Sequence, residues 1–311
     1  MEFFNHFLVN PERFRIPQYA ISPFSHEWIK TNYALSKSDQ PVNKDLLSHY
    51  FGHYLCFESG RSALSCALAQ YGLSTDDEVW ILTTTGNRYI SGCVTREIEK
   101  YCKWSRQQSE KTKLILVNHE FGTVYRAMDE VLKFNLPVIE DMAMSMFSTD
   151  DNRQTGNYGD FTIFSLPKFF PVQWGGILKI NNPSFRHIQP ITGNPFLSQT
   201  LLKYVSFYLA DAASINQLRK QNNILFQNHL GCLDFKNRFT YSENETPAVY
   251  MCSTPSSVNL DGLKVFLQQN GVESSVFYGE NAFFVPVHQY LREEDILFIV
   301  SLIKYYCNDN K

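Results

Sequence analysis

Short apolar runs alternate with amphipathic stretches from residue 54 to residue 180 of this chain. The apolar runs, which predict β-strands, cover residues 54–57, 79–82, 113–117, 138–140, 161–164 and 177–180. Apolar residues at helical spacing lie between some of these runs, at 62–71 and 129–134. Strands that alternate with helices form mainly parallel sheets with helices on both faces. We therefore predict an α/β fold for this half, with ligands bound at the carboxyl ends of the strands.

The second half of the chain has a different pattern. Helices are predicted at 199–209, 215–230, 260–270 and 293–306, and strands at 247–254, 276–278 and 282–286. These elements predict a small α+β domain. We therefore assign residues 1–184 to a large α/β domain with an N-terminal arm, and residues 185–311 to linking helices and the small domain. Residues 1–43 hold four prolines among scattered aromatic residues, which predicts an irregular arm that packs on the rest of the protein.

Composition and charge exclude several classes of function. Of the 311 residues, 44% are hydrophobic and 19% are charged, which is typical of a folded protein and not of a disordered one. The formal net charge of −3 provides no field that would attract nucleic acid. We see neither a signal peptide nor a run of the roughly 20 apolar residues that span a membrane. Seven cysteines without a C-x-x-C pair predict free thiols, a cytoplasmic location and no metal site.

Residues 156–176 carry the first candidate for chemistry. An apolar strand leads through Ser165 to a single lysine, Lys168, in the run L-P-K-F-F-P. An ammonium group in such apolar surroundings is poorly hydrated, which favours the neutral amine that attacks a carbonyl. A lysine that forms a Schiff base needs this property. A surface lysine at the end of a strand is the alternative, and this stretch considered alone favours that alternative.

Two further motifs complete a recognisable set. Asp141 ends a strand that precedes Lys168, and the turn E-S-G-R-S-A-L opens an apolar helix. The backbone amides and the dipole at such a helix start favour a phosphate, so Gly60, Arg61 and Ser62 are candidate phosphate ligands. Capping of the helix by a serine of the turn is the alternative. A lysine, an aspartate that keeps a pyridine nitrogen protonated, and a phosphate turn form the minimal set for pyridoxal 5′-phosphate (PLP).

The order and spacing of these motifs resemble the DegT family of nucleotide-sugar aminotransferases, which are PLP enzymes with the aspartate-aminotransferase fold (fold type I). The resemblance extends from about residue 47 to about residue 306. It implies that Lys168 is the catalytic lysine and that Ser165 and Met144 also contact the cofactor. It further implies an amino-acid donor, with glutamate expected, a nucleotide-linked keto sugar as acceptor for surface polysaccharide synthesis, and a homodimer with sites near its interface.

Three positions depart from the family pattern. Met144 stands where the family has a glutamine or histidine beside the cofactor ring, and a thioether donates no hydrogen bond. Where the family places an aromatic residue stacked on the ring, this chain has Gly-Asn-Arg, with Tyr89 just beyond. Ser165 precedes Lys168 by three residues and not by five, and the run K-F-F-P-V-Q-W-G-G matches a shorter form found in capsule-type relatives.

These departures leave alternatives open. A degenerate relative that does not catalyse and serves as a scaffold or partner is the alternative from another class of function. A PLP-dependent sugar dehydratase is the alternative within the family, but such relatives replace the lysine with histidine, so Lys168 argues against it. His119, in the run N-H-E-F-G, is more often a structural histidine in this position, and we assign it no role.

Overall fold

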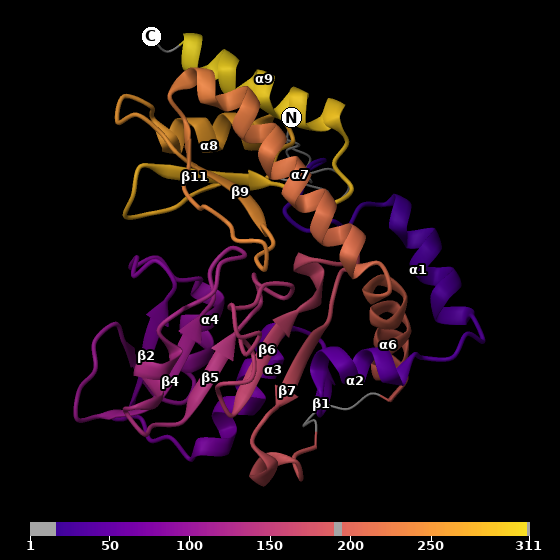
Figure 1. The fold of residues 1–311 in the computed structure, drawn as a ribbon, viewed down its shortest axis with the longest axis vertical. Coiled ribbons are helices and arrows are strands. Elements are labelled where there is room, and N and C mark those ends of the chain that lie inside the picture. Colours follow the sequence, from indigo (N-terminus) through magenta and orange to yellow (C-terminus); the bar gives the residue numbers. More distant parts are fainter. Residues whose placement is uncertain (1–16, 190–194, 310–311) are drawn as a thin grey trace, which may run out of the picture.

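The computed structural model describes residues 17–189 and 195–309, and these residues form a seven-stranded sheet and a four-stranded sheet (Figure 1). The large sheet has the order β1-β7-β6-β5-β4-β2-β3. Its strands are β1 (Tyr54–Phe57), β2 (Glu78–Thr83), β3 (Lys103–Ser105), β4 (Thr112–Asn118), β5 (Val138–Asp141), β6 (Phe161–Ser165) and β7 (Gly176–Ile180). Strands β2 to β6 run parallel to one another, and β7 is antiparallel to both of its neighbours, β6 and β1. The predicted mainly parallel α/β sheet is confirmed.

Helices cover both faces of the large sheet, as predicted. On one face, α3 (Gly60–Leu68) and α4 (Gly92–Ile98) pack on a buried cluster that includes Ile163 and Leu178. On the other face, α2 (Lys44–Phe51) and α6 (Pro195–Leu209) pack on Phe164 and Ile177, and α5 (Met128–Leu132) packs on Ile115. Neighbouring residues of one strand therefore pack into the hydrophobic cores on opposite faces of the sheet, because successive side chains of a strand point to opposite faces.

The small sheet is antiparallel and has the order β10-β11-β9-β8. Its strands are β8 (Lys236–Asn237), β9 (Val249–Ser253), β10 (Ser275–Val276) and β11 (Ala282–Pro286), and its helices are α7 (Ala212–Leu230), α8 (Leu260–Gln269) and α9 (Glu293–Asp309). Helix α7 runs from α6 to the small sheet, where Phe226 and Leu230 join its core (Figure 1). The domain boundary at residues 184/185 stays a prediction; α6 packs with the large sheet.

The prediction of an irregular arm is wrong for residues 27–37, which form helix α1 (Glu27–Lys37). The prolines that suggested an irregular chain lie outside this stretch, so they do not interrupt the helix. Asn32 of α1 is buried, and it donates to the backbone carbonyl of Pro171 at 2.8 Å and accepts from the Tyr208 hydroxyl at 2.6 Å. Before α1, Tyr19 pairs with Val272 in a bridge to the small domain. Residues 1–16 of the predicted arm lie outside the described residues.

No helix within the described ranges is both long enough and apolar enough to cross a membrane.

Candidate active site

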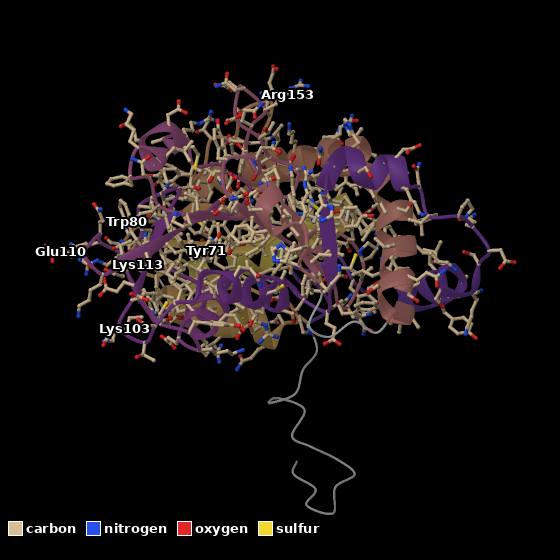
Figure 2. The ribbon with its side chains drawn as sticks, turned by 90° about the horizontal axis from the view of Figure 1, so that it is seen from below. Tyr71, Trp80, Lys103, Glu110, Lys113 and Arg153 are labelled. Atoms are coloured by element: carbon tan, nitrogen blue, oxygen red, sulfur yellow. The ribbon has the colours of Figure 1, made fainter. Side chains whose placement is uncertain are left out.

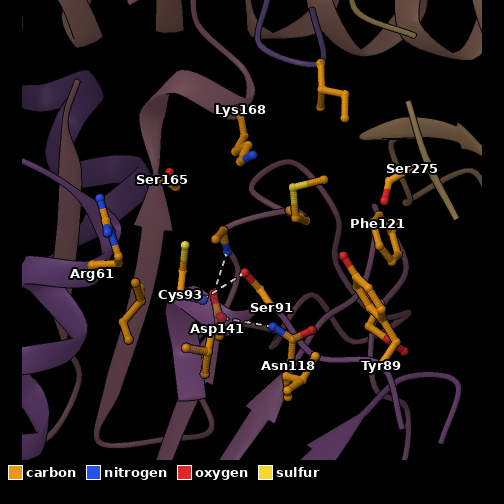
Figure 3. Close-up of a pocket in the computed structure, with 18 of the residues that line it drawn as sticks. Arg61, Tyr89, Ser91, Cys93, Asn118, Phe121, Asp141, Ser165, Lys168 and Ser275 are labelled. Carbon is orange, nitrogen blue, oxygen red and sulfur yellow. Dashed lines mark hydrogen bonds between the residues drawn. The ribbon is translucent and has the colours of Figure 1, made fainter. Parts of the chain in front are cut away.

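A cavity of about 490 Å³ lies at the carboxyl ends of β4, β5 and β6 and is closed on its far side by residues of the small domain. Its lining includes six of the seven predicted site residues, namely Gly60, Arg61, Asp141, Met144, Ser165 and Lys168. Ser62 is the predicted residue that does not line it. Figure 3 shows the Lys168 side chain pointing into the cavity from one side, with Asp141 on the other and Ser165 and Arg61 along one edge. Motifs separated in the sequence therefore meet around one space.

The loop that carries Lys168 is held by side chains from the second half of the chain. Lys168 ends a single helical turn after β6, the 3-10 turn Leu166–Lys168, and its side chain is partly buried. Arg219 of α7 donates to the Lys168 backbone carbonyl at 2.9 Å, and Gln289 donates to the Phe169 carbonyl at 2.8 Å. These two bonds fix the two peptide groups that follow the lysine and leave its amine free to reach the cavity.

Arg219 is a fully buried guanidinium without a carboxylate partner in the described part of the chain. Besides Lys168 it donates to the Gln289 side chain at 2.9 Å and to the carbonyls of Pro247 and Ala248 at 3.2 and 3.3 Å. Its guanidinium carbon lies 4.5 Å from the centre of the Phe169 ring. Burial lowers the pKa of Arg219 to about 9. No sequence motif indicated this residue.

Asp141 ends β5 as a buried carboxylate with two fixed hydrogen bonds. The Asn118 side chain, at the end of β4, donates to it at 2.9 Å, and the Ala143 backbone amide donates at 2.9 Å. Burial raises the pKa of Asp141, and these two hydrogen bonds oppose that effect. The bond from Asn118 to Asp141 depends on the pairing of β4 with β5, which brings the ends of the two strands together.

In the turn at Gly60, the Ser62 amide takes part in helix capping, which was the alternative to phosphate binding. Gly60 and Arg61 line the cavity. The Ser62 amide donates to Ser59 Oγ at 3.1 Å, so the Ser59 side chain caps the helix. A Cβ atom on Gly176 would lie 2.3 Å from the backbone carbon of Ser59, so the turn packs directly against β7. Gly175 has a φ of +123°, and its amide donates to the Glu58 carbonyl at 2.8 Å. The glycine pair after Lys168 therefore positions the start of α3 beside Ser165.

The wall opposite Gly60 is aromatic and acidic. Tyr89 and Phe121 both line the cavity, and their ring centres lie 6.4 Å apart. Glu120 is buried, and its carboxylate accepts from the Thr85 amide and hydroxyl at 2.7 Å each. Burial raises the pKa of Glu120, and the bonds from Thr85 oppose this effect. We did not predict Glu120 from the sequence, because one acid in a loop carries no distinguishing pattern.

His119 is structural, in line with the lack of an assigned role. Its ring is fully buried, and Nδ1 accepts from the Tyr125 amide at 3.0 Å. Nε2 lies 3.3 Å from the Glu140 carboxylate and acts as the donor to it. His119 does not line the cavity.

The residues around the cavity fit PLP in their chemistry. Within the described residues no cationic side chain forms an ion pair with Asp141, so a protonated ring nitrogen would supply the charge that this buried carboxylate lacks. The first turn of α3, at Gly60 and Arg61, has backbone amides without intrahelical partners, which suits the phosphate. Lys168 lies within the same cavity and provides an amine for the cofactor aldehyde.

Comparison with known proteins agrees with this geometry. Residues 105–187, which contain Asp141, Ser165 and Lys168, match the model of the DegT/DnrJ/EryC1/StrS aminotransferase family. Within this segment, which is about a quarter of the chain, the sequence is similar to that family. The match supports the sequence prediction of a PLP-dependent sugar aminotransferase.

Solved structures of three aminotransferases share the fold of this chain. The aminotransferase TlmJ from Streptoalloteichus hindustanus is 14% identical, with a TM-score of 0.74 over 94% of this chain and 98% of that chain. The putative sugar aminotransferase Spr1654 from Streptococcus pneumoniae is 18% identical, with a TM-score of 0.74 over 96% and 98%. Helicobacter pylori PseC, an aminotransferase involved in the biosynthesis of pseudoaminic acid, is 14% identical, with a TM-score of 0.72 over 95% and 100%. At these identities the likeness shows the fold, and the predicted fold type I is confirmed.

Proposed function

We propose that this chain is a DegT-family aminotransferase that transfers an amino group from an amino acid, with glutamate as donor, to a nucleotide-linked keto sugar used in surface polysaccharide synthesis. The observation that carries the proposal is the arrangement of Lys168 and Asp141, which lie on opposite sides of one cavity beside the anion-binding turn at Gly60. A scaffold protein has no need for a buried, fully hydrogen-bonded acid across a cavity from a lysine.

Different residues of the cavity have different roles in the proposed reaction. PLP, when bound, supplies an aldehyde that receives the amino group and a ring that stabilises negative charge on the neighbouring carbon. We assign to Asp141 the task of keeping the ring nitrogen protonated. Lys168 holds the cofactor at rest and afterwards moves a proton between the substrate carbon and the cofactor. Gly60, Arg61 and Ser165 hold the phosphate.

The opposite wall of the cavity provides the surface for the sugar. Glu120 and Glu273 supply carboxylate acceptors there, and Ser275 supplies a hydroxyl group that both donates and accepts. Such groups suit the hydroxyl-rich face of a sugar. The cytoplasmic location and the homodimer with sites near the interface remain part of this proposal, because nucleotide sugars and the amino-acid donor are cytoplasmic metabolites and the family resemblance implies the dimer.

The proposal is tested by locating the cofactor and observing the first half-reaction. Borohydride reduction of the PLP-loaded protein, followed by peptide mapping, should place the pyridoxyl group on Lys168 and not on Lys179, the half-buried lysine of β7. Addition of glutamate before reduction should change the cofactor absorbance and prevent this labelling. A label on another lysine, or no label at saturating PLP, would exclude Lys168 as the catalytic residue and favour the scaffold alternative.

A further inference from the structure

A second cavity, of about 510 Å³, lies on the opposite face of the large sheet from the active site. Asp141, Ile163 and Ser165 line the active site, whereas their chain neighbours Met142 and Phe164 line this second cavity. Because successive residues of a strand point to opposite faces, the sheet separates the two spaces. The cavity therefore belongs to no part of the site already described.

The lining of this second cavity is strongly cationic. Arg153, Lys179 and Lys220 line it, together with His49, and Glu243 is the one acidic residue among the described residues that do so. None of these cations forms an ion pair with a described residue. Their elements are far apart in the sequence: the crossover between β5 and β6, strand β7 and helix α7. Such a convergence of unpaired positive charge favours an anion.

Lys179 is the cation most firmly placed. It lies in the middle of β7 and is half-buried, and its Nζ donates to the Asn157 side chain at 2.6 Å. An ammonium group has three N–H donors, so two remain for a ligand. Burial lowers the pKa of Lys179, while the nearby carboxylate of Glu140 raises it. Glu140 itself is fully buried and accepts from three backbone amides, which leaves it outside the cavity.

Lys220 and Arg153 extend the positive surface. Lys220 Nζ donates to the Glu243 backbone carbonyl at 2.5 Å, which also leaves two of its donors available. Arg153 has a φ of +57°, a left-handed conformation that is uncommon for an arginine, on the exposed side of the crossover. Figure 2 shows Arg153 at the margin of the molecule, well separated from Lys113.

Aromatic rings form another part of the lining. Tyr50 of α2 and Phe147 of the crossover are half-buried, with ring centres 6.4 Å apart at an interplanar angle of 84°. Half-buried rings beside a cationic wall offer one surface for a planar group and another for phosphates. The cavity volume falls within the range of about 300–1,000 Å³ that small-molecule sites have.

We propose that this second cavity binds a phosphorylated ligand with a planar ring, of the nucleoside diphosphate class. Lys179, Lys220 and Arg153 hold the phosphates, and the Tyr50 and Phe147 rings contact the base. The site does not depend on the proposed transamination, because the sheet separates it from Lys168.

Calorimetric titration of the PLP-loaded protein with uridine diphosphate tests this proposal. We expect saturable binding that Lys179→Gln and Lys220→Gln each weaken by about tenfold, because each removes one charge-assisted contact. Lys113→Gln is the matched control: it removes the same charge from an exposed position on β4, and it should leave the affinity unchanged. Thermal unfolding of each variant shows whether the fold is retained, and Lys220, near the surface of α7, provides the second variant if Lys179→Gln does not fold.

Two further comparisons separate the possible outcomes. Inorganic pyrophosphate should bind more weakly than uridine diphosphate, and equal affinities would show that the rings take no part. The variants of the second cavity separate it from the active site, which is proposed to take a nucleotide-linked sugar. If neither Lys179→Gln nor Lys220→Gln weakens the binding of uridine diphosphate, the nucleotide binds elsewhere and the proposal is wrong. Absence of saturable binding to the wild-type protein would also overturn it.

Discussion

Arg219 contacts the catalytic lysine candidate through its backbone: the guanidinium donates to the Lys168 carbonyl at 2.9 Å. The guanidinium binds the peptide group of Lys168 and not its amine, so it fixes the backbone position from which the side chain extends. Arg219 lies on α7, the helix that runs from the large domain to the small domain. The position of Lys168 is therefore tied to the placement of the second half of the chain.

The first prediction concerns this contact. Arg219→Lys should lower the free energy of unfolding by about 3 kcal/mol, because an ammonium cannot reproduce a planar fork that serves four buried acceptors. It should also slow PLP labelling of Lys168. Urea denaturation and borohydride trapping measure the two effects. Arg186→Lys, at an exposed site, is the matched control and should stay within about 0.5 kcal/mol. Wild-type stability in Arg219→Lys would show that the network contributes little.

The second prediction concerns the acid. Asp141→Asn should keep the fold, because Asn118 can still donate to the amide oxygen at this position. A neutral amide cannot hold a protonated ring nitrogen, so the glutamate-dependent change in cofactor absorbance should slow by about 10²-fold or more. Circular dichroism checks the fold, and stopped-flow absorbance measures the rate. A wild-type rate in this variant would mean that another acid serves the cofactor.

The third prediction concerns Met144, which lines the cavity where the family pattern has a hydrogen-bonding side chain. Met144→His should tighten PLP binding by about fivefold, because it restores a donor worth about 1 kcal/mol. Met144→Leu is the matched control, since it keeps an apolar side chain of similar size and should leave the affinity unchanged. Spectroscopic titration with PLP measures both. If neither wild type nor Met144→His develops the absorbance of lysine-bound PLP, the aminotransferase proposal fails.

The fourth prediction concerns stability and pH. Burial and the nearby charge of Arg219 hold the pKa of His288 at about 3, below its usual 6.5. Between these values the unfolded chain binds more protons than the folded one, so stability is lost as the pH falls below 6.5. From pH 7.5 to 5.5 the wild type should lose about 1 kcal/mol more than His288→Asn, measured by urea denaturation. Equal losses would show that His288 titrates normally in the folded protein.

Local patterns in the sequence account for the centre of the fold. Strand β5 was predicted one residue short of its observed end at Asp141, since its apolar residues give way to two acids there. Strand β11 is a continuous apolar run and was predicted with its observed bounds. The residues Asp141 and Lys168 were found because each follows such a run. Strand β10 (Ser275–Val276) overlaps the strand predicted at 276–278 by one residue. Strands β3 and β8 have three and two residues, which is too short for a recognisable pattern. Their pairing comes from neighbouring strands and not from their own composition.

The supporting residues of the site were beyond the reach of sequence analysis for a different reason. Asn118 contacts Asp141 because β4 pairs with β5 in one register. Arg219 and Gln289 reach the Lys168 loop only after the small domain has docked. In each case the role of the residue depends on a contact with a residue that is distant in the sequence. An arginine in an amphipathic helix is ordinarily read as a solvent-exposed residue, and α7 offered no signal that Arg219 is buried.

The attachment of the first described residues has a consequence for the order in which the protein is made. Tyr19 pairs with Val272, and Asn32 of α1 binds Tyr208, so both wait for partners in the second half of the chain. At synthesis rates of about 5–20 residues per second, Tyr19 leaves the ribosome roughly ten seconds or more before its partner. During that interval the aromatic residues of α1 have nothing to pack against. This segment is thus made early but is among the last of the described residues to find its partners.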